Sequence, residues 1–205
     1  MGMQTDTYKT ISRPSAELLY KERKSKFYGN AYPIQTEEEV KPLIEALRKK
    51  HRTANHVCYA WQLGVENPRY RANDDGEPNN SAGMPIYGQI QSFEVTNVLV
   101  TVTRIFGGTK LGVGGLIGAY RETARLSLDA ADIVERILEQ SILLHFGYPQ
   151  MEKVMRTIKQ DQITIVAQRL EIDCELLIAI QKSRSKEVLQ KFQEMYGVAA
   201  KFKTF

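Results

Sequence analysis

Residues 97–125 of the chain read NVLVTVTRIFGGTKLGVGGLIGAYRETAR. The first ten residues are rich in branched side chains, which favour a strand, and six glycines follow before a helical pattern that runs to about Asp132. A strand, a glycine-rich turn and a helix form an arrangement with which proteins often bind a phosphate. The stretch therefore raises three alternatives: a nucleotide site, a contact with a nucleic-acid backbone, or a tight turn alone.

Neither common nucleotide fingerprint fits these glycines. A P-loop needs a lysine and a hydroxyl residue directly after its last glycine, whereas Lys110 precedes Gly112 and no Lys-Ser or Lys-Thr pair follows. A dinucleotide fingerprint needs G-x-G-x-x-G, and Gly112, Gly114 and Gly118 give a spacing that is one residue too long. The sequence therefore gives no fingerprint of a catalytic nucleotide site.

The stretch can bind an anion without either fingerprint. Gly114 and Gly115 open the predicted helix, where free backbone amides favour anions. Basic residues lie on both sides of the turn, and Glu122 is the only acid in residues 104–125; the basic residues are Arg104, Lys110, Arg121 and Arg125. In the alternative interpretation the glycines serve packing and positive φ angles, and the basic residues form a solvated face.

The remaining pattern predicts an α+β protein with two domains, at residues 1–138 and 139–205. In the first domain we expect strands at 27–34, 56–64 and 97–106, helices at 36–52, 84–93 and 115–132, and a long polar loop at 65–83. Thr36 and Glu39 form a capping-box pair at the start of the first helix. In the second domain, strands at 141–148, 162–173, 174–183 and 199–205 and helices at 149–158 and 185–197 give the order βαββαβ of a ferredoxin-like unit.

Acidic residues gather in the loop of residues 65–83, near His56 in the preceding strand. Asp74, Asp75 and Glu77 could hold a metal or act as an acid–base set, but no ligand spacing supports a metal, and DDGEPNN is favourable turn chemistry. Ser81 lacks the G-x-S-x-G context of a hydrolase. We therefore expect no metal, no cofactor and no catalytic residue.

The composition is ordinary for a globular protein, with 42% apolar and 25% charged residues and a net charge of +4. Cys58 and Cys174 lie far apart in apolar runs, which predicts buried free thiols. The polar N-terminus lacks the apolar core of a signal peptide, and no apolar run approaches the ~20 residues of a membrane span. We expect a cytoplasmic protein that is a monomer or self-associates weakly.

Four blocks of the sequence resemble the IMPACT family, also called the YigZ family. In chain order they are ERKSKFYGNAYPI (22–34), ANHVCYAW (54–61), DDGEPNNSAGMPI (74–86) and VTRIFGGTKLGVGGLIGAY (102–120). The glycine block is highly specific for the family, and the resemblance covers about residues 15–130. The chain departs from the family pattern at Asn79, Asn80, Ser81, Ile105 and Gly118.

The resemblance implies a ribosomal protein S5 domain 2-like fold for the first domain. For the second it implies a ferredoxin-like fold similar to domain V of elongation factor G. Because the two folds also follow one another in that factor, the resemblance suggests a module that faces RNA or the ribosome. Eukaryotic relatives regulate translation by binding an activator of a stress-responsive kinase.

The resulting expectation is a non-catalytic protein that binds nucleic acid, with RNA preferred over DNA, or the ribosome and translation factors. Two alternatives stay open: an enzyme acting on a nucleotide or small phosphorylated metabolite, and a protein–protein adaptor. The expected contact residues are Lys26, His56, Arg104, Gly107, Gly108, Lys110, Gly112, Gly114, Gly115 and Arg121, with Asp75, Glu77 and Ser81 as further contributors from the loop.

Overall fold

The computed structural model describes residues 6–203, and within this range the chain divides into two compact units. One unit spans residues 8–136, and the other contains residues 137–203 together with residues 6 and 7. Both units combine β-sheet with helices, so the predicted α+β class is confirmed. The division after Arg136 lies close to the boundary after residue 138 that the sequence predicts.

The unit of residues 8–136 is built on a five-stranded sheet whose neighbouring strands run antiparallel. Its strands, in spatial order, are β2 (Leu18–Glu22), β3 (Ser25–Pro33), β6 (Val98–Ile105), β4 (His56–Leu63) and β5 (Arg69–Asn73). The central strand β6 is buried at every residue except its last, as expected for an apolar run enclosed on both faces.

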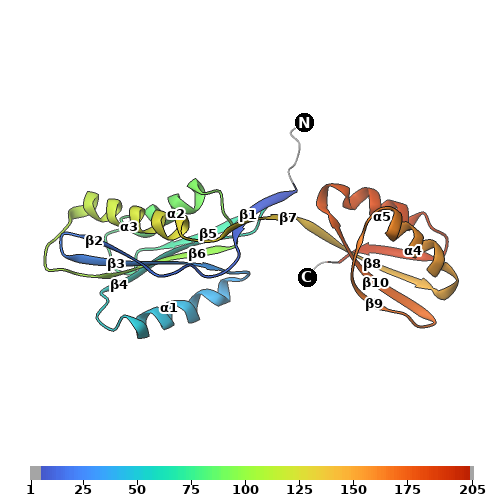
Figure 1. The fold of residues 1–205 in the computed structure, drawn as a ribbon, viewed down its shortest axis with the longest axis horizontal. Helices are drawn as coiled ribbons and strands as arrows, with labels where there is room; N and C mark the ends of the chain where they lie inside the picture. The colour runs from blue at the N-terminus through green and yellow to red at the C-terminus, as the bar shows by residue number, and fades with distance from the viewer. Residues whose placement is uncertain (1–5, 204–205) are drawn as a thin grey trace. The chain divides into compact units, whose positions relative to one another are not determined.

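Helices cover both faces of this sheet (Figure 1). Helices α2 (Gly83–Ser92) and α3 (Gly112–Asp129) pack on one face, and α1 (Val40–Lys50) packs on the other. A short 3-10 turn, Glu37–Glu39, precedes α1, and the predicted capping box of Thr36 and Glu39 is present there. The sheet and helices therefore form three layers with two separate apolar interfaces.

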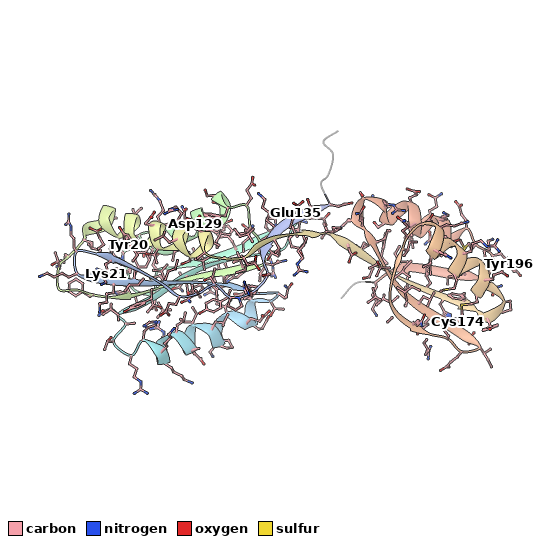
Figure 2. The ribbon with its side chains drawn as sticks, viewed as in Figure 1. Tyr20, Lys21, Asp129, Glu135, Cys174 and Tyr196 are labelled. Carbon is pink, nitrogen blue, oxygen red and sulfur yellow. The ribbon has the colours of Figure 1, made fainter. Side chains whose placement is uncertain are left out.

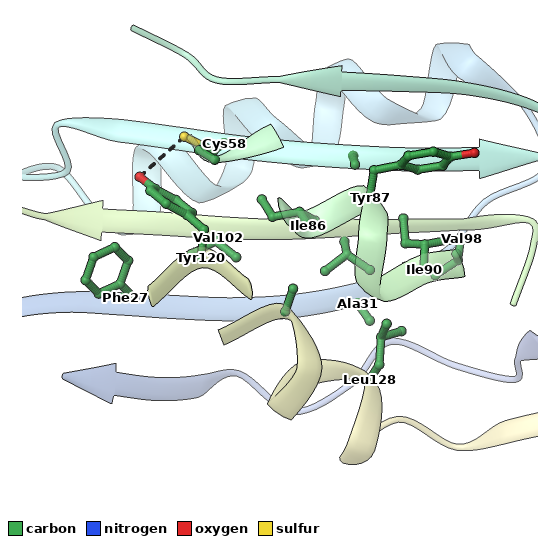
Figure 3. Packing of buried hydrophobic residues seen from close by; sticks show 14 of the residues in the cluster. Phe27, Ala31, Cys58, Ile86, Tyr87, Ile90, Val98, Val102, Tyr120 and Leu128 are labelled. Atoms are coloured by element: carbon green, nitrogen blue, oxygen red, sulfur yellow. Dashed lines mark hydrogen bonds between the residues drawn. The ribbon is translucent and has the colours of Figure 1, made fainter. Parts of the chain in front are cut away.

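Successive residues of β6 serve these two interfaces in turn. Val98, Val100 and Val102 pack against α2 and α3, while Leu99 packs with Trp61 on the side of α1. This alternation follows from the two-residue period of a strand. Figure 3 shows the larger interface, in which side chains from the sheet and both helices interdigitate.

The second unit contains a four-stranded antiparallel sheet in the order β11-β8-β10-β9. Its elements are β8 (Glu139–Gly147), a 3-10 turn (Tyr148–Gln150), α4 (Met151–Gln160), β9 (Thr164–Arg169), β10 (Asp173–Gln181), a 3-10 turn (Lys182–Arg184), α5 (Ser185–Gln193) and β11 (Val198–Phe202). From β8 to β11 they follow the predicted order βαββαβ. The last predicted strand extends to residues 204–205, which lie outside the described residues.

Both cysteines are buried free thiols, as the sequence predicts. Cys174 lies in the core of the second unit, whereas Tyr196 of the same unit is 92% exposed; both are labelled in Figure 2. Among the helices of residues 6–203, none is long and apolar enough to cross a membrane.

Four strands before Leu138 were missed or misassigned from the sequence. β5 lies inside the predicted loop of residues 65–83, and β2 forms the other edge of the five-stranded sheet. β1 (Thr7–Ile11) pairs with β7 (Ile133–Ile137) in a separate two-stranded sheet. β5, with the sequence RYRAN, is exposed at its first three residues, and such a short polar edge strand lacks an apolar signal.

Candidate functional site

The glycine turn, defined here as residues 106–112, connects the end of β6 to the start of α3. Gly107 lies directly against the β2–β3 hairpin, because a Cβ there would be 2.0 Å from the carbonyl carbon of Lys24. Its amide donates a hydrogen bond of 3.2 Å to Oγ of Ser25. Gly108 and Gly112 have φ angles of +86° and +73°, which favour glycine. These three glycines therefore have structural roles within the fold.

The glycines of α3 itself are under less constraint. Gly114 and Gly118 have open space where a Cβ would be placed, and Gly115 would place its Cβ 3.1 Å from that of Leu111. Packing within the unit therefore does not require a glycine at position 114 or 118. The alternative in which the glycines serve packing and positive φ angles therefore accounts for the glycines of the turn but not for Gly114 and Gly118 of α3.

Arg104 is buried, in contrast to the exposed phosphate contact that we expected. It lies near the end of β6 with Phe27 and His56 as its cross-strand neighbours, so all three side chains project from one face of the sheet. Its guanidinium carbon lies 5.5 Å from the ring centroids of both Phe27 and Phe106. Nη1 of Arg104 donates a hydrogen bond of 2.6 Å to Oε1 of Glu77.

Glu77 connects three side chains from three different elements. Its Oε1 also accepts a hydrogen bond of 2.8 Å from the hydroxyl of Tyr120 on α3, and it lies 3.9 Å from Nε2 of His56. Burial, together with Cys58 and Glu77, raises the pKa of Tyr120, so the phenol stays protonated and acts as the donor. Cys58 lies behind this group, with its Sγ 3.4 Å from the hydroxyl of Tyr120 (Figure 3).

The loop that carries Glu77 is fixed by the acidic residues around it. Oδ1 of Asp74 accepts hydrogen bonds from the amides of Ala82 and Gly83, at the start of α2. Asp75 pairs with Arg48 at 2.6 Å and accepts the amide of Val57. These contacts explain the acidic cluster as turn chemistry that holds Glu77 in place.

Two further loop contacts set the orientation of predicted site residues. The backbone carbonyl of Asp75 accepts a 2.8 Å hydrogen bond from Nδ1 of His56, which leaves Nε2 directed away from that bond. The hydroxyl of Ser81 donates to the carbonyl of Pro78 at 2.6 Å, and Ser81 is fully buried. Ser81 therefore stabilises the loop from inside. In the described part of the chain, no group of three or more His, Cys, Asp or Glu residues could hold a metal.

A pocket of about 420 Å³ opens between this loop and the glycine turn. It brings together five of the predicted residues, which are His56, Glu77, Arg104, Lys110 and Gly112. Its other lining residues are Asn55, Pro78, Phe106, Leu111, Val113 and Leu116. Sequence reasoning missed these residues and also Tyr120, although several of them lie inside the specific glycine block at residues 102–120.

Other predicted residues do not line this pocket. Lys26 is exposed and pairs across the strands with Ile105, so its side chain projects from the opposite face of the sheet to Arg104. Arg121 is exposed on α3. Arg125 forms ion pairs with Glu122 and Asp129 of its own helix. Also outside the lining are Asp75, Ser81, Gly107, Gly108, Gly114 and Gly115.

These features define the class of the protein as a two-unit α+β protein with a pocket at the end of its larger sheet, between a glycine turn and an acidic loop. A family model described as the Impact N-terminal domain matches residues 23–128, which include every residue of the pocket. The chain therefore belongs to the IMPACT family, as its four sequence blocks indicate.

Curated relatives and a solved structure agree with this assignment. The IMPACT family member YvyE of Bacillus subtilis is 33% identical over 142 residues, and the match covers 69% of this chain and 65% of the relative. An IMPACT family member of Thermus thermophilus is 35% identical over 132 residues, or 64% of this chain and 70% of the relative. A crystal structure described as a hypothetical protein shares the fold, with a TM-score of 0.72 at 23% identity over 96% of this chain and 97% of its own.

Proposed function

We propose that this protein is a non-catalytic regulator of translation that binds RNA or the ribosome through the surface around the glycine turn. The glycine-turn surface is formed by the exposed side chains of Lys24, Arg52, Phe106, Lys110 and Val113. The proposal rests on one observation in particular. No ion pair to an acidic residue is found for Lys24, Arg52 or Lys110 in residues 6–203.

Three chain segments come together to form this surface. The β2–β3 hairpin carries Lys24 and packs directly on Gly107. The amide of Phe106 donates to Oδ1 of Asn55, which places the segment after α1, with Arg52, beside the turn. Unpaired basic residues around an exposed aromatic ring suit a nucleic-acid strand, because the cations neutralise phosphates while a base stacks on the ring.

Family membership supports a role in translation, since the resemblance to the IMPACT family implies translational regulation in its eukaryotic members. We also infer the finer fold names on the same basis: S5 domain 2-like for the first unit and ferredoxin-like for the second. The sheet order β11-β8-β10-β9, with the order βαββαβ, supports the second name. The proposed function places the protein in the cytoplasm, where buried free thiols such as Cys58 and Cys174 are ordinary.

The test compares salt-dependent binding of two double variants to purified ribosomes and to single-stranded RNA. Lys24→Ala/Lys110→Ala removes two charges from the glycine-turn surface. Lys41→Ala/Lys186→Ala removes two exposed charges elsewhere, from α1 and α5. We expect only the first variant to weaken binding, and to reduce the slope of log affinity against log salt by about 1.4 on single-stranded RNA.

Two results would contradict this proposal. If the wild-type protein binds neither RNA nor ribosomes at ~50 mM salt, the assignment fails. If the two double variants lose affinity equally, binding depends on total charge and the glycine-turn surface is not the site. A partner that survives nuclease and high salt would instead support a protein–protein adaptor.

A further inference from the structure

The guanidinium of Arg104 has more hydrogen-bond donors than the protein satisfies. Its side chain is 7% exposed, and Nη1 is occupied by Glu77. Nε is fully buried and has no hydrogen-bond partner among the described residues. Leaving a buried donor without an acceptor is unfavourable, because the donor has lost its hydrogen bonds to water. Arg104 lines the pocket, and its Nη2, which forms no hydrogen bond with the described residues and is not fully buried, is the donor that a ligand with acceptor atoms can reach there.

A second set of free donors lines the same pocket from the amino end of α3. This 18-residue helix begins at Gly112, its cap residue Leu111 offers no side-chain acceptor, and its first turn contains no acidic residue. The first amides of a helix have no partner within the helix and form its positive end. Gly112 and Val113 line the pocket together with Arg104. Two independent sets of donors therefore share one pocket.

The charge of the pocket favours an anion. Arg104 and Lys110 contribute two positive charges against the one negative charge of Glu77, which leaves a net charge of +1. Nε2 of His56 lies 3.9 Å from Glu77, beyond a normal hydrogen bond, and His56 is one of the residues that line the pocket. Donors from β6, the glycine turn and α3 suit a tetrahedral phosphate, whose three terminal oxygens point in different directions, better than a planar carboxylate.

The rest of the pocket wall is apolar and aromatic. Phe106 is 42% exposed, and the guanidinium of Arg104 lies 5.5 Å from its ring centroid. Leu111, Val113 and Leu116 complete this side of the pocket. An exposed aromatic ring of this kind offers a platform on which a nucleobase stacks. The volume of about 420 Å³ lies in the range of small-molecule sites, and so the pocket has room for more than a bare phosphate.

We infer that this pocket binds the phosphate monoester of a nucleotide, with the phosphate on Arg104, Lys110 and the amino end of α3 and the base against Phe106. A free nucleotide and the phosphorylated 5′ end of an RNA strand both carry this chemistry. The RNA source rests on the proposed function, whereas the free nucleotide does not. The buried floor formed by Glu77 and Arg104 favours a strand end over a continuous backbone, because a backbone cannot pass through it.

A pair of substitutions at Val113 tests the site without disturbing the buried ion pair. Val113 is 54% exposed in the first turn of α3, where Asp stabilises a helix, so Val113→Asp should fold. Val113→Asn is the neutral control of the same size. We measure binding of adenosine 5′-monophosphate and of adenosine by calorimetry. We expect the nucleotide to bind the wild type and Val113→Asn alike, and to bind Val113→Asp about tenfold more weakly. Adenosine should also bind the wild type about tenfold more weakly than the nucleotide.

A second pair of probes separates the two sources of the phosphate. A short oligoadenylate with a 5′-phosphate is compared with the same strand carrying a 5′-hydroxyl. A preference for the phosphorylated strand that Val113→Asp abolishes assigns the RNA end. Binding of the nucleotide without binding of either strand assigns a free nucleotide and contradicts the proposed function.

The inference is overturned if neither probe pair shows a preference for the phosphate monoester, or if Val113→Asp and Val113→Asn bind both phosphorylated probes equally. In that case, salt-dependent binding of both RNA strands would leave the proposed function standing. The experiments therefore distinguish a pocket that does not bind a phosphate monoester from a glycine-turn surface that does not bind RNA.

Discussion

Nη1 of Arg104 donates a 2.6 Å hydrogen bond to Oε1 of Glu77, and the two side chains are only 7% and 4% exposed. This buried ion pair joins the central strand β6 to the acidic loop before α2. The same two residues line the pocket, so one contact holds the loop in place and forms the floor of the candidate site. The stability of the unit and the shape of the site are therefore linked.

Glu77→Ala should destabilise the protein strongly. The substitution leaves the charge of Arg104 buried without a partner and removes the acceptor of the Tyr120 hydroxyl. Breaking a buried ion pair from one side costs about 3–5 kcal/mol. Urea unfolding measures the loss, and Glu45→Ala on the exposed side of α1 is the control, with a change within about 0.5 kcal/mol. A loss below about 1 kcal/mol for Glu77→Ala would show that water replaces the missing carboxylate.

Two glycines of the same sequence block should respond to alanine in opposite directions. At Gly107 a Cβ would lie 2.0 Å from the backbone of Lys24, so Gly107→Ala must displace the β2–β3 hairpin and should cost about 1–3 kcal/mol. At Gly118, inside α3, a Cβ meets nothing within 4 Å, so Gly118→Ala should stabilise the protein by about 0.5–1 kcal/mol. Thermal unfolding of both variants checks the pair. Loss of stability in Gly118→Ala would contradict the open environment described for that residue.

The fold could be predicted where a local pattern carries the information. The branched run of residues 97–106 marks the central strand, and the βαββαβ order of the second unit follows from alternating strand and helix periods. β5 could not be recognised in the same way. An edge strand has only one neighbouring strand, and its side chains are more exposed to solvent. RYRAN therefore lacks the apolar residues that mark a strand.

The pocket could be predicted only in part, because the register between distant strands creates it. His56 and Arg104 become neighbours through the pairing of β4 with β6, and Glu77 reaches them from a loop that reads as turn chemistry. No local spacing in the sequence predicts that His56, Arg104 and Glu77 lie close together. The sequence did identify five lining residues, since the glycine block and the acidic loop both stand out. It did not indicate that Arg104 is buried, because an arginine at the end of a strand is usually solvated.

Cys58 should be unreactive in the folded protein despite its position beside Tyr120 and Glu77. Burial raises the pKa of the Cys58 thiol, with a further contribution from nearby carboxylates, so the reactive thiolate is scarce at neutral pH. Cys174 is also fully buried. A thiol-disulfide reagent at pH 8 should therefore label neither cysteine before unfolding and both of them in urea. Rapid labelling of Cys58 in the native protein would instead indicate an exposed, activated thiol.

Glu17→Gln should make the stability of the protein less sensitive to acid. Burial alone raises the pKa of Glu17, but hydrogen bonds from His51 and Lys50, both 2.9 Å long, outweigh it and lower the pKa below its ordinary value of 4.5. The carboxylate of Glu17 takes up a proton more readily in the unfolded protein than in the folded one. Its contribution to the free energy of unfolding is therefore complete above pH 4.5 and is lost as the pH falls through the lowered pKa of the folded protein. Urea unfolding at a series of pH values below 5 should therefore give a shallower pH dependence for Glu17→Gln than for the wild type or for Glu45→Gln. Equal slopes for the three proteins would show that the contact of Glu17 with His51 and Lys50 does not persist in solution.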